Sequence, residues 1–506
     1  MSYELSSSTR VAVIGAGSMG SGIAQLAAQS GHQVLLHDAQ PGAGERGLER
    51  IAADLDGAVK RGKLADLDRT MILGRIRVAG CLEELEGSGL VVEAIVERLE
   101  PKQSLFRTLE PLLSSQAVLA TNTSSISVTA VAQGLHHPER VIGWHFFNPA
   151  PRMKLVEIIR GVETDPALAS ALRDLSNAWG KTAVDAPNTP GFIVNRVARP
   201  YYAEALRLLA EGVAEASVVD RLLREAGGFA MGPFELMDLI GLDVNLSVSE
   251  SVFHATAYDP RYAPSILQQE LVRSGRLGRK SGCGFYRYGD ASEPGIVDTI
   301  APTTAIEPIR VPTELGLLDP LVERLRLAGS VIVQHSQSIH EGLEFGSVRV
   351  ALTDGRTAAE CSAQDGPGLI LLDLALDFGK TALIGVTADA AALPHVGALA
   401  ASLAPAGIAL VALEDVAGLV VMRTVCCLAN EAADVMTWTG AKAADIDTAM
   451  QLGTAYPRGP LSWADGLGCS RVAAVLTHLQ AHYGETRYRR APALSRRHFS
   501  RGAFHE

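Results

Sequence analysis

A glycine-rich stretch near the N-terminus constrains the fold more than any other part of this sequence. Apolar residues 11–14 precede Gly15, Gly17 and Gly20, which are spaced as G-x-G-x-x-G and open an Ala-rich helical segment. Glycines at these positions allow a tight strand-to-helix turn and the close approach of a pyrophosphate to the helix N-terminus. The stretch therefore predicts the start of a dinucleotide-binding βαβ unit.

An acidic residue follows at the place where such a unit contacts a ribose. A second strand, residues 33–37, ends at Asp38, eighteen residues after Gly20. A carboxylate there accepts hydrogen bonds from the ribose 2′-hydroxyl and repels a 2′-phosphate, which favours NAD over NADP. The simpler alternative is a glycine-rich turn that only packs a helix on a sheet.

Strand-like and helical segments continue to alternate after Asp38. Strands are expected at 90–95, 117–121 and 141–147, with helices at 44–61 and 101–113. This pattern predicts a doubly wound parallel sheet, which binds ligands at the C-terminal ends of its strands. Polar residues stand near three of those ends: Glu97, the run 122–125, and His145.

Composition and pattern divide the whole chain into five parts. We expect an NAD-binding Rossmann domain at 1–187, a helical domain at 188–289, a linker rich in Pro, Thr and acidic residues at 290–324, a reduced Rossmann-like α/β unit at 325–412, and a second, degenerate helical domain at 413–506. Strands of the reduced unit are expected at 347–352, 368–374, 381–386 and 408–413. The predicted fold class is an α/β Rossmann domain plus an all-α domain, followed by a reduced α/β unit and a second copy of the all-α domain.

The second helical domain repeats the first. The segment GFIVNRVARPYYAEALRLLAEG from Gly191 resembles GLVVMRTVCCLANEAADVMTWTG from Gly418, and MGPFELMDLIG at 231–241 resembles RGPLSWADGLG at 458–468. Both matches lie in one constant register, which indicates a duplication. Met422 stands where the first copy has Asn195, so we expect only the first copy to serve a site.

A histidine at the end of an apolar run is the candidate for catalysis. His145 opens the segment HFFNPAPRMKLVE, and a histidine can take up a proton and return it near neutral pH. If the Asn-Pro-Ala-Pro segment is a turn, the chain reverses and brings Glu157 back to His145, where a carboxylate would orient the imidazole. Together with NAD, this pair points to the oxidation of an alcohol. Taken alone, a histidine beside apolar residues is more often a satisfied core residue.

Four motifs in combination resemble the L-3-hydroxyacyl-CoA dehydrogenase family over about residues 8–288: VVEAIVE ending at Glu97, NTSS from Asn122, HFFNPAPRMKLVE, and GFIVNR. The layout of the whole chain resembles the long bacterial members, which include 3-hydroxyadipyl-CoA and 3-hydroxybutyryl-CoA dehydrogenases. The resemblance implies NAD-dependent oxidation of (S)-3-hydroxyacyl-CoA to 3-oxoacyl-CoA, in phenylacetate or fatty-acid breakdown.

The resemblance also implies roles at the substrate. His145 is expected to be the general base and Glu157 its partner, and Ser124 is expected to bind the substrate's 3-oxygen. Asn148 would contact the substrate or support His145, and Asn195 would project into a substrate cleft. Judged separately, Ser124 could be a helix cap, Asn148 a turn former and Asn195 a surface residue.

The expected cofactor and CoA contacts form two further groups. The cofactor, NAD, is expected to contact Gly15, Gly17, Gly20, Asp38, Glu97, Lys102 and Asn122, and no metal is expected. Arg61 and Lys63, next to Lys60, would bind the 3′-phosphate of CoA, although such a run is usually a solvated face. Arg152 stands where the family motif usually has a small apolar residue, so it would either pair with the terminal carboxylate of an adipyl chain or point to water.

Length, net charge and cysteine content limit the kinds of binding partner and the location that we expect. The chain has 506 residues and a net charge of -11, which disfavours a nucleic-acid partner. It shows no secretory signal and no apolar run long enough to span a membrane, and its six cysteines lack paired spacing, so we expect a cytoplasmic protein with reduced thiols. An acyl-CoA substrate is the expected partner. A homo-oligomer is possible, with the two helical copies forming an internal pseudo-dimer.

Two other functions fit part of this pattern. β-Hydroxyacid dehydrogenases share the layout but use a lysine for proton transfer and act on free acids, and the HFFNP run favours the acyl-CoA reading. A non-catalytic NAD-binding structural protein is the other alternative, since some lens crystallins resemble this family. The presence of both His145 and Glu157 favours an active enzyme.

Overall fold

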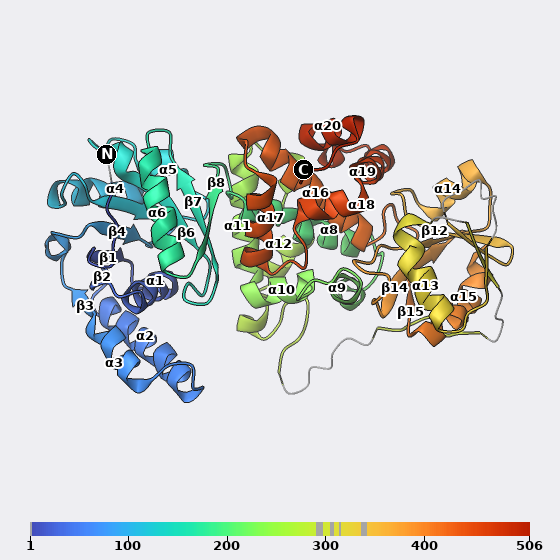
Figure 1. Cartoon of the computed structure of the whole chain (residues 1–506), viewed down its shortest axis with the longest axis horizontal. Coiled ribbons are helices and arrows are strands. Elements are labelled where there is room, and N and C mark those ends of the chain that lie inside the picture. The colour runs from blue at the N-terminus through green and yellow to red at the C-terminus, as the bar shows by residue number, and fades with distance from the viewer. Residues whose placement is uncertain (1–2, 290–296, 304–307, 313–314, 335–341, 506) are drawn as a thin grey trace. The chain divides into compact units, whose positions relative to one another are not determined.

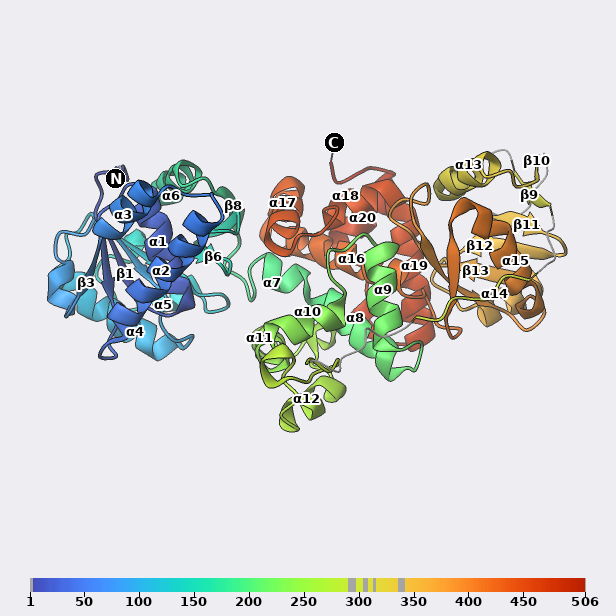
Figure 2. The same cartoon turned by 90° about the horizontal axis from the view of Figure 1, so that it is seen from below.

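The structure is a computed structural model that describes residues 3–289, 297–303, 308–312, 315–334 and 342–505 (Figures 1 and 2). The chain forms two compact units. The first comprises Met1–Arg196 with Ala444–Thr454, and the second comprises Val197–Ala443 with Ala455–Glu506.

The first unit is built on an eight-stranded sheet in the order β3-β2-β1-β4-β5-β6-β7-β8. Its strands are β1 (Val11–Ile14), β2 (Val34–His37), β3 (Ile76–Ala79), β4 (Leu90–Glu93), β5 (Val118–Thr121), β6 (Val141–Phe146), β7 (Leu155–Arg160) and β8 (Thr182–Ala186). The predicted Rossmann domain is confirmed. The sheet is not parallel throughout, because the chain turns back after β6 and β7 pairs antiparallel with it.

Helices cover both faces of this sheet. They are α1 (Ser18–Gln29), α2 (Ala43–Lys60), α3 (Asp66–Gly74), α4 (Leu99–Leu109), α5 (Val128–Val131) and α6 (Pro166–Ala178). Apolar residues of α1, α2, α3 and α6 share one buried core with alternate residues of the central strands. On the other face, a Cβ added to Gly143 of β6 would lie 2.8 Å from Val128 of α5, so α5 packs directly on the strand that carries His145.

The glycine turn between β1 and α1 leaves no room for larger residues at two of its three glycines. Gly15 has φ +99°, and a Cβ there would lie 2.4 Å from the carbonyl oxygen of Ala94. A Cβ at Gly20 would lie 1.7 Å from the carbonyl oxygen of Gly15. These two glycines fix the turn, because any side chain would push α1 away from the sheet.

The second unit contains the first helical copy and most of the second. The first copy has helices α8 (Arg199–Ala210), α9 (Ala216–Glu225), α10 (Pro233–Ile240), α11 (Leu242–Ala255) and α12 (Ile266–Arg273). The second copy has α16 (Val421–Thr439), α17 (Ala443–Thr454), α18 (Pro460–Leu467), α19 (Cys469–Tyr483) and α20 (Pro492–Ser500). Residues 444–454 of α17 belong instead to the first unit, where Gly453 packs against Leu155 and Val194.

A mixed seven-stranded sheet forms the reduced α/β unit, in the order β10-β9-β11-β12-β13-β14-β15. Its strands are β9 (Ile309–Val311), β10 (Ile332–Gln334), β11 (Leu343–Phe345), β12 (Val348–Leu352), β13 (Leu369–Leu372), β14 (Leu383–Ala388) and β15 (Ala409–Ala412), with helices α13 (Asp319–Leu327), α14 (Ala358–Asp365) and α15 (Val396–Leu403). Strands were expected at the places of β12 to β15.

The expectation of a plain linker at 290–324 needs correction. Strand β9 and residues 319–324 of α13 lie inside this range. Ile309 and Val311 are buried because β9 pairs with both β10 and β11, so the segment adds a strand to the sheet. Residues 290–296, 304–307 and 313–314 of the predicted linker lie outside the described residues.

Backbone conformation supports the duplication independently of sequence. Positive φ angles recur at pairs of residues that the register of the two copies aligns: Gly191 (75°) and Gly418 (77°), Phe192 (49°) and Leu419 (52°), Gly228 (74°) and Ala455 (56°), and Gly241 (101°) and Gly468 (86°). A bulky residue rarely adopts a positive φ. The two copies therefore share their strained turns as well as their helices, and the predicted second copy of the helical domain is confirmed.

The two copies contact each other reciprocally. Glu204 on α8 and Glu431 on α16 are equivalent positions in the same register. The hydroxyl of Tyr488, from the second copy, donates to Glu204 at 3.0 Å, and the hydroxyl of Tyr262, from the first, donates to Glu431. Both tyrosines end a single 3₁₀ turn, η4 (Pro260–Tyr262) and η9 (Thr486–Tyr488). Such reciprocity is the property of an isologous contact between two identical subunits.

A buried arginine strengthens one side of this contact. Arg423 of α16 is fully buried and donates to Glu204 at 2.7 Å and to Tyr488 at 2.8 Å. Burial works to raise the pKa of Glu204, but the guanidinium groups of Arg207 and Arg423 hold the pKa of that carboxyl below its ordinary value.

We expect Arg423→Met to lower the free energy of unfolding of this unit by about 3–5 kcal/mol, because it leaves buried acceptors behind. Chemical denaturation measures the change. The double variant Arg423→Met/Glu204→Gln should lose less free energy of unfolding than the two single variants lose in sum. The exposed pair Arg273–Glu270 is the matched control, and Arg273→Met should cost at most about 1 kcal/mol. Strictly additive effects of Arg423→Met and Glu204→Gln would contradict a coupled pair.

Candidate active site

The turn between β6 and β7 brings a histidine and a glutamate together. The antiparallel register pairs His145 with Glu157 directly, so both side chains lie on the same face of the sheet. His145 Nδ1 and Glu157 Oε2 are 2.7 Å apart, and the two side chains are 7% and 0% exposed. The predicted reversal of the chain is therefore confirmed.

The second oxygen of Glu157 is also engaged, which the sequence did not reveal. Oε1 accepts hydrogen bonds from the backbone N–H groups of Ile193 (3.0 Å) and Val194 (3.1 Å), at the start of α7 (Val194–Val197). The carboxylate is thus fixed at both oxygens and cannot turn away from His145.

The loop after β5 lies beside this pair. The side-chain oxygen of Asn122 accepts a hydrogen bond from the backbone N–H of Phe146 at 2.8 Å, one residue after His145. The Asn195 Nδ2 atom is 3.5 Å from the carbonyl oxygen of Ser124, at the limit of a hydrogen bond. Three predicted site residues (Asn122, Ser124 and Asn195) therefore gather near the histidine's strand.

Glu97 holds the Ser-containing loop. Its Oε1 atom accepts hydrogen bonds from the Thr123 hydroxyl at 2.6 Å and from the backbone N–H groups of Ser124 at 2.7 Å and Ser125 at 3.2 Å. Burial works to raise the pKa of Glu97, but the Lys102 ammonium and the Thr123 hydroxyl outweigh it and hold that pKa below its ordinary value. Glu97 is therefore a fixed anion that shapes the loop.

A buried lysine connects Glu97 to the sheet. Lys102 is 1% exposed, and its Nζ atom lies 2.7 Å from Glu93 and 3.2 Å from Glu97. Glu93, at the end of β4, also accepts a hydrogen bond from the Thr121 hydroxyl at 2.7 Å. Sequence reasoning missed Glu93, although the motif VVEAIVE contains both glutamates. Contact of Glu97 and Lys102 with the cofactor stays a prediction.

The glycine turn fits a dinucleotide. The position of an added Cβ at Gly17 faces open space, with no atom of the protein within 4 Å, so a pyrophosphate can approach the N-terminus of α1 there. Asp38 follows β2, and its carboxylate accepts hydrogen bonds from the backbone N–H groups of Ala16 at 2.7 Å and Gln40 at 2.9 Å. Its position at the end of the second strand suits a ribose hydroxyl.

Other predicted residues lie elsewhere on this unit. Arg61 and Lys63 follow the C-terminal end of α2 and are exposed. Arg152 pairs with Asp54 of α2 at 2.7 Å, with 62% of its side chain exposed, so it has a partner within the protein. The Ser18 hydroxyl, at the start of α1, lies 3.4 Å from the Asn148 side-chain oxygen, so Asn148 sits beside the glycine turn.

Comparison with known proteins identifies the family. Residues 10–189 match the NAD-binding domain of 3-hydroxyacyl-CoA dehydrogenases, and residues 191–288 and 418–505 match their C-terminal domain. The chain belongs to the 3-hydroxyacyl-CoA dehydrogenase family. Residues 350–416 match the reduced Rossmann-fold domain of 3-hydroxybutyryl-CoA dehydrogenase. The predicted family and the NAD cofactor are confirmed, and family membership decides against a β-hydroxyacid dehydrogenase.

Relatives of this dehydrogenase differ in how much of its chain they match. The chain is 42% identical to the 3-hydroxyadipyl-CoA dehydrogenase of Escherichia coli K12, over 96% of this chain and 97% of that one. The crystal structure of an E. coli K12 3-hydroxybutyryl-CoA dehydrogenase matches with a TM-score of 0.88 and 40% identity, over 97% of this chain and 98% of that one. A probable 3-hydroxybutyryl-CoA dehydrogenase of Bacillus subtilis is 42% identical but covers 55% of this chain and 97% of its own length.

No helix in the described part of the chain combines the length and the apolar character that crossing a membrane requires. Within the same residues, no group of three or more His, Cys, Asp or Glu side chains is arranged to hold a metal ion.

A second buried lysine fixes the turn between the two members of the dehydrogenase's His–Glu pair. Lys181 is 6% exposed, and its Nζ atom donates to the carbonyl oxygens of Ala150 at 2.6 Å and Met153 at 2.7 Å. Burial lowers the pKa of Lys181 to about 8. Nothing in the sequence distinguished this lysine from a surface lysine.

We expect Lys181→Met to destabilise the protein by about 1–3 kcal/mol, because two carbonyl groups lose their donor. Because its pKa is lower in the folded protein, the Lys181 ammonium loses its proton at a lower pH in the folded chain than in the unfolded chain. Wild-type stability should therefore rise relative to the variant between about pH 8 and 10.5. Thermal unfolding at several pH values measures the difference. Exposed Lys154→Met is the control, and a difference that stays constant over this range would contradict the assignment.

Proposed function

We propose that this chain oxidises a short (S)-3-hydroxyacyl-CoA with His145 as the general base and Glu157 as its partner. The observation that carries the proposal is the 2.7 Å contact between His145 Nδ1 and the fully buried Glu157 carboxylate. Because Nδ1 is engaged, Nε2 is the nitrogen available to a substrate. A buried carboxylate at Nδ1 selects one tautomer and stabilises the imidazolium that forms.

The reaction requires one proton and one hydride to leave the substrate. His145 Nε2 takes the proton from the 3-hydroxyl group, and the C3–O single bond becomes a carbonyl as hydride leaves C3. NAD, when bound, is the hydride acceptor. We assign Ser124 and Asn195 to the 3-oxygen, since both lie at the loop that Glu97 orders.

The remaining assignments extend those made from sequence. Asn148 would contact the substrate from its place beside α1. Arg61 and Lys63 would meet CoA phosphates, which their exposure permits. The cofactor would contact the glycine turn, Asp38 and the group that includes Glu97, Lys102 and Asn122.

We propose 3-hydroxyadipyl-CoA or 3-hydroxybutyryl-CoA as the substrate, in phenylacetate or fatty-acid breakdown. Two relatives that match nearly the whole chain support this choice, because one is named for the adipyl and one for the butyryl thioester. The idea that Arg152 binds a distal carboxylate gains no support, since Arg152 already pairs with Asp54.

The organisation of the chain is part of the proposal. We propose domains at 1–187, 188–289 and 413–506, a reduced α/β domain that extends the expected 325–412 back to β9 at residue 309, and an internal pseudo-dimer of the two helical copies. The reciprocal contacts of Tyr262 with Glu431 and of Tyr488 with Glu204 support the pseudo-dimer. A cytoplasmic location agrees with six cysteines that are all free.

We expect Glu157→Gln and His145→Asn each to lower kcat about 10²–10⁴-fold, because the base loses its orientation or is removed. The rate of acetoacetyl-CoA reduction, monitored as the decrease in NADH absorbance, measures the effect. Binding of NAD should stay near wild type, and exposed Glu163→Gln should keep full activity. A wild-type rate in either variant would overturn the role, and an inactive wild-type protein would favour an NAD-binding structural protein.

A panel of 3-hydroxyacyl-CoA substrates tests which acyl chain the enzyme prefers. We expect kcat/KM to be highest for the butyryl or the adipyl thioester, and lower for monocarboxylic six- and eight-carbon chains. Arg152→Ala should leave the ratio of adipyl to butyryl turnover unchanged, because Arg152 pairs with Asp54. A selective loss of adipyl turnover would instead assign Arg152 to the distal carboxylate.

A further inference from the structure

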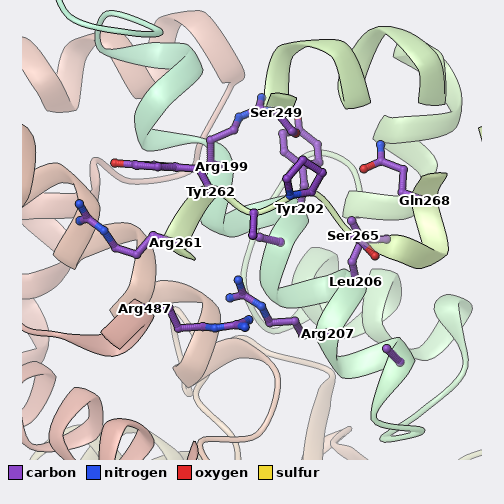
Figure 3. A pocket seen from close by; sticks show the side chains of 14 residues that line it. Arg199, Tyr202, Leu206, Arg207, Ser249, Arg261, Tyr262, Ser265, Gln268 and Arg487 are labelled. Atoms are coloured by element: carbon purple, nitrogen blue, oxygen red, sulfur yellow. The ribbon is translucent and has the colours of Figure 1, made fainter. Parts of the chain in front are cut away.

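A cavity of about 190 Å³ lies in the second unit, between α8, the segment 261–265 and η9 (Figure 3). Four arginines line it: Arg199, Arg207, Arg261 and Arg487. None of the described residues that line it is an aspartate or a glutamate. We call it the arginine pocket. It involves none of the residues assigned to the dehydrogenase reaction.

The duplication shows how this concentration of positive charge arises. In the register that aligns the two copies, Arg207 of α8 is equivalent to Asp434 of α16. Arg261 and Arg487 lie one residue out of this register and are matched by their 3₁₀ turns instead, since each directly precedes the tyrosine that ends its turn. In one half of the contact between copies, Arg261 bridges to Asp434 at 3.0 Å and to Glu431 at 3.1 Å. In the other half, the equivalent of Asp434 is itself an arginine, so an ion pair is replaced by two cations.

Figure 3 shows the geometry of these two cations. The guanidinium groups of Arg207 and Arg487 point toward one another at the pocket, whereas Arg261 turns away from them. Arg199 extends from α8 to the Ser249 hydroxyl, which it contacts at 3.1 Å. The pocket therefore presents Arg207 and Arg487 across a gap, with Arg199 and Ser249 nearby.

The carboxylates that pair with these arginines lie outside the pocket. Arg207 pairs with Glu204, on its own helix, and Arg487 pairs with Glu485, two residues earlier in the chain. Glu204 also binds Arg423 at 2.7 Å and Tyr488 at 3.0 Å, so its charge is shared among several donors. Arg207 and Arg487 are 16% and 19% exposed, so water screens their mutual repulsion only in part.

We propose that the arginine pocket binds a phosphate group. A guanidinium group offers a planar pair of donors that matches phosphate oxygens, and two or three of them around one dianion offset its charge. The Ser249 hydroxyl and the Gln268 amide supply neutral polar atoms in the same lining. The phosphate belongs either to a CoA ester, in which case this pocket takes the place assigned above to Arg61 and Lys63, or to a free phosphate compound.

Titration calorimetry with inorganic phosphate and with 3′,5′-ADP, using the full-length protein, tests the proposal. Arg207→Asp places an acid where the other half has Asp434, so phosphate binding should weaken by at least about tenfold. Arg207→Gln should weaken binding less, and it covers the case in which Arg207→Asp fails to fold. Arg326→Asp, which makes the same charge change at an exposed residue of α13, is the control and should bind like wild type.

Enzyme kinetics separate the two sources of phosphate. If the pocket takes a CoA phosphate, 3′,5′-ADP binds more tightly than phosphate, and Arg207→Gln raises KM for acetoacetyl-CoA while kcat is unchanged. If it takes a free phosphate compound, KM is unchanged and only the phosphate-induced rise in melting temperature is lost. Wild-type protein that binds neither anion, or Arg207→Asp that binds phosphate as tightly as wild type, would overturn the proposal. A defect in His145 or Glu157 lowers kcat, but it leaves the calorimetric binding of phosphate and the phosphate-induced rise in melting temperature unchanged, so a failure of the proposed catalytic roles is distinguishable from a failure of the arginine pocket.

Discussion

The carboxylate of Glu157 is the interaction on which the site depends. One oxygen holds His145 Nδ1 and the other receives two backbone N–H groups from Ile193 and Val194. A buried carboxylate without such donors would be costly, so its burial requires both partners at once. The same residue thereby fixes the imidazole and the start of the segment that carries Asn195. Glu157 therefore determines both the orientation of the His145 imidazole and the path of the chain where it leaves the sheet.

The parts of the fold that sequence predicts are those with a local physical cause. Gly15 and Gly20 occupy places where no side chain fits, and the His145–Glu157 pair follows from a turn between two strands. The duplication is visible because its matching blocks keep one register. Strands β9, β10 and β11 were not predicted, because each is only three residues long and β9 pairs with β10 and β11 through contacts that are remote in the chain. The change of strand direction at β7 is set by the turn, which only the structure shows in full.

The buried charges mark the limit of sequence reasoning in this protein. Lys102, Lys181 and Arg423 are all nearly inaccessible, yet in the sequence they look like the solvated cations that most lysines and arginines are. Each of them finds its hydrogen-bond or ion-pair partners at other positions of the chain: Glu93 and Glu97, two loop carbonyls, or Glu204 and Glu211. No local pattern encodes such a set. The arginine pocket is likewise not encoded by a local pattern. Only an alignment of the two copies shows that Arg207 stands where the second copy has the acid Asp434.

The reciprocal tyrosine–glutamate contacts join two halves of one polypeptide. In an assembly of separate subunits such a contact depends on protein concentration, and it is lost on dilution. Here the intervening chain holds both halves at a constant effective concentration, so the contact persists in a single molecule. A tethered partner is also free to diverge, since a substitution in one half is not copied into the other. The second copy has Met422 at the position equivalent to Asn195, and Asp434 at the position equivalent to Arg207. The two halves of a homodimer come from one coding sequence and cannot differ in this way.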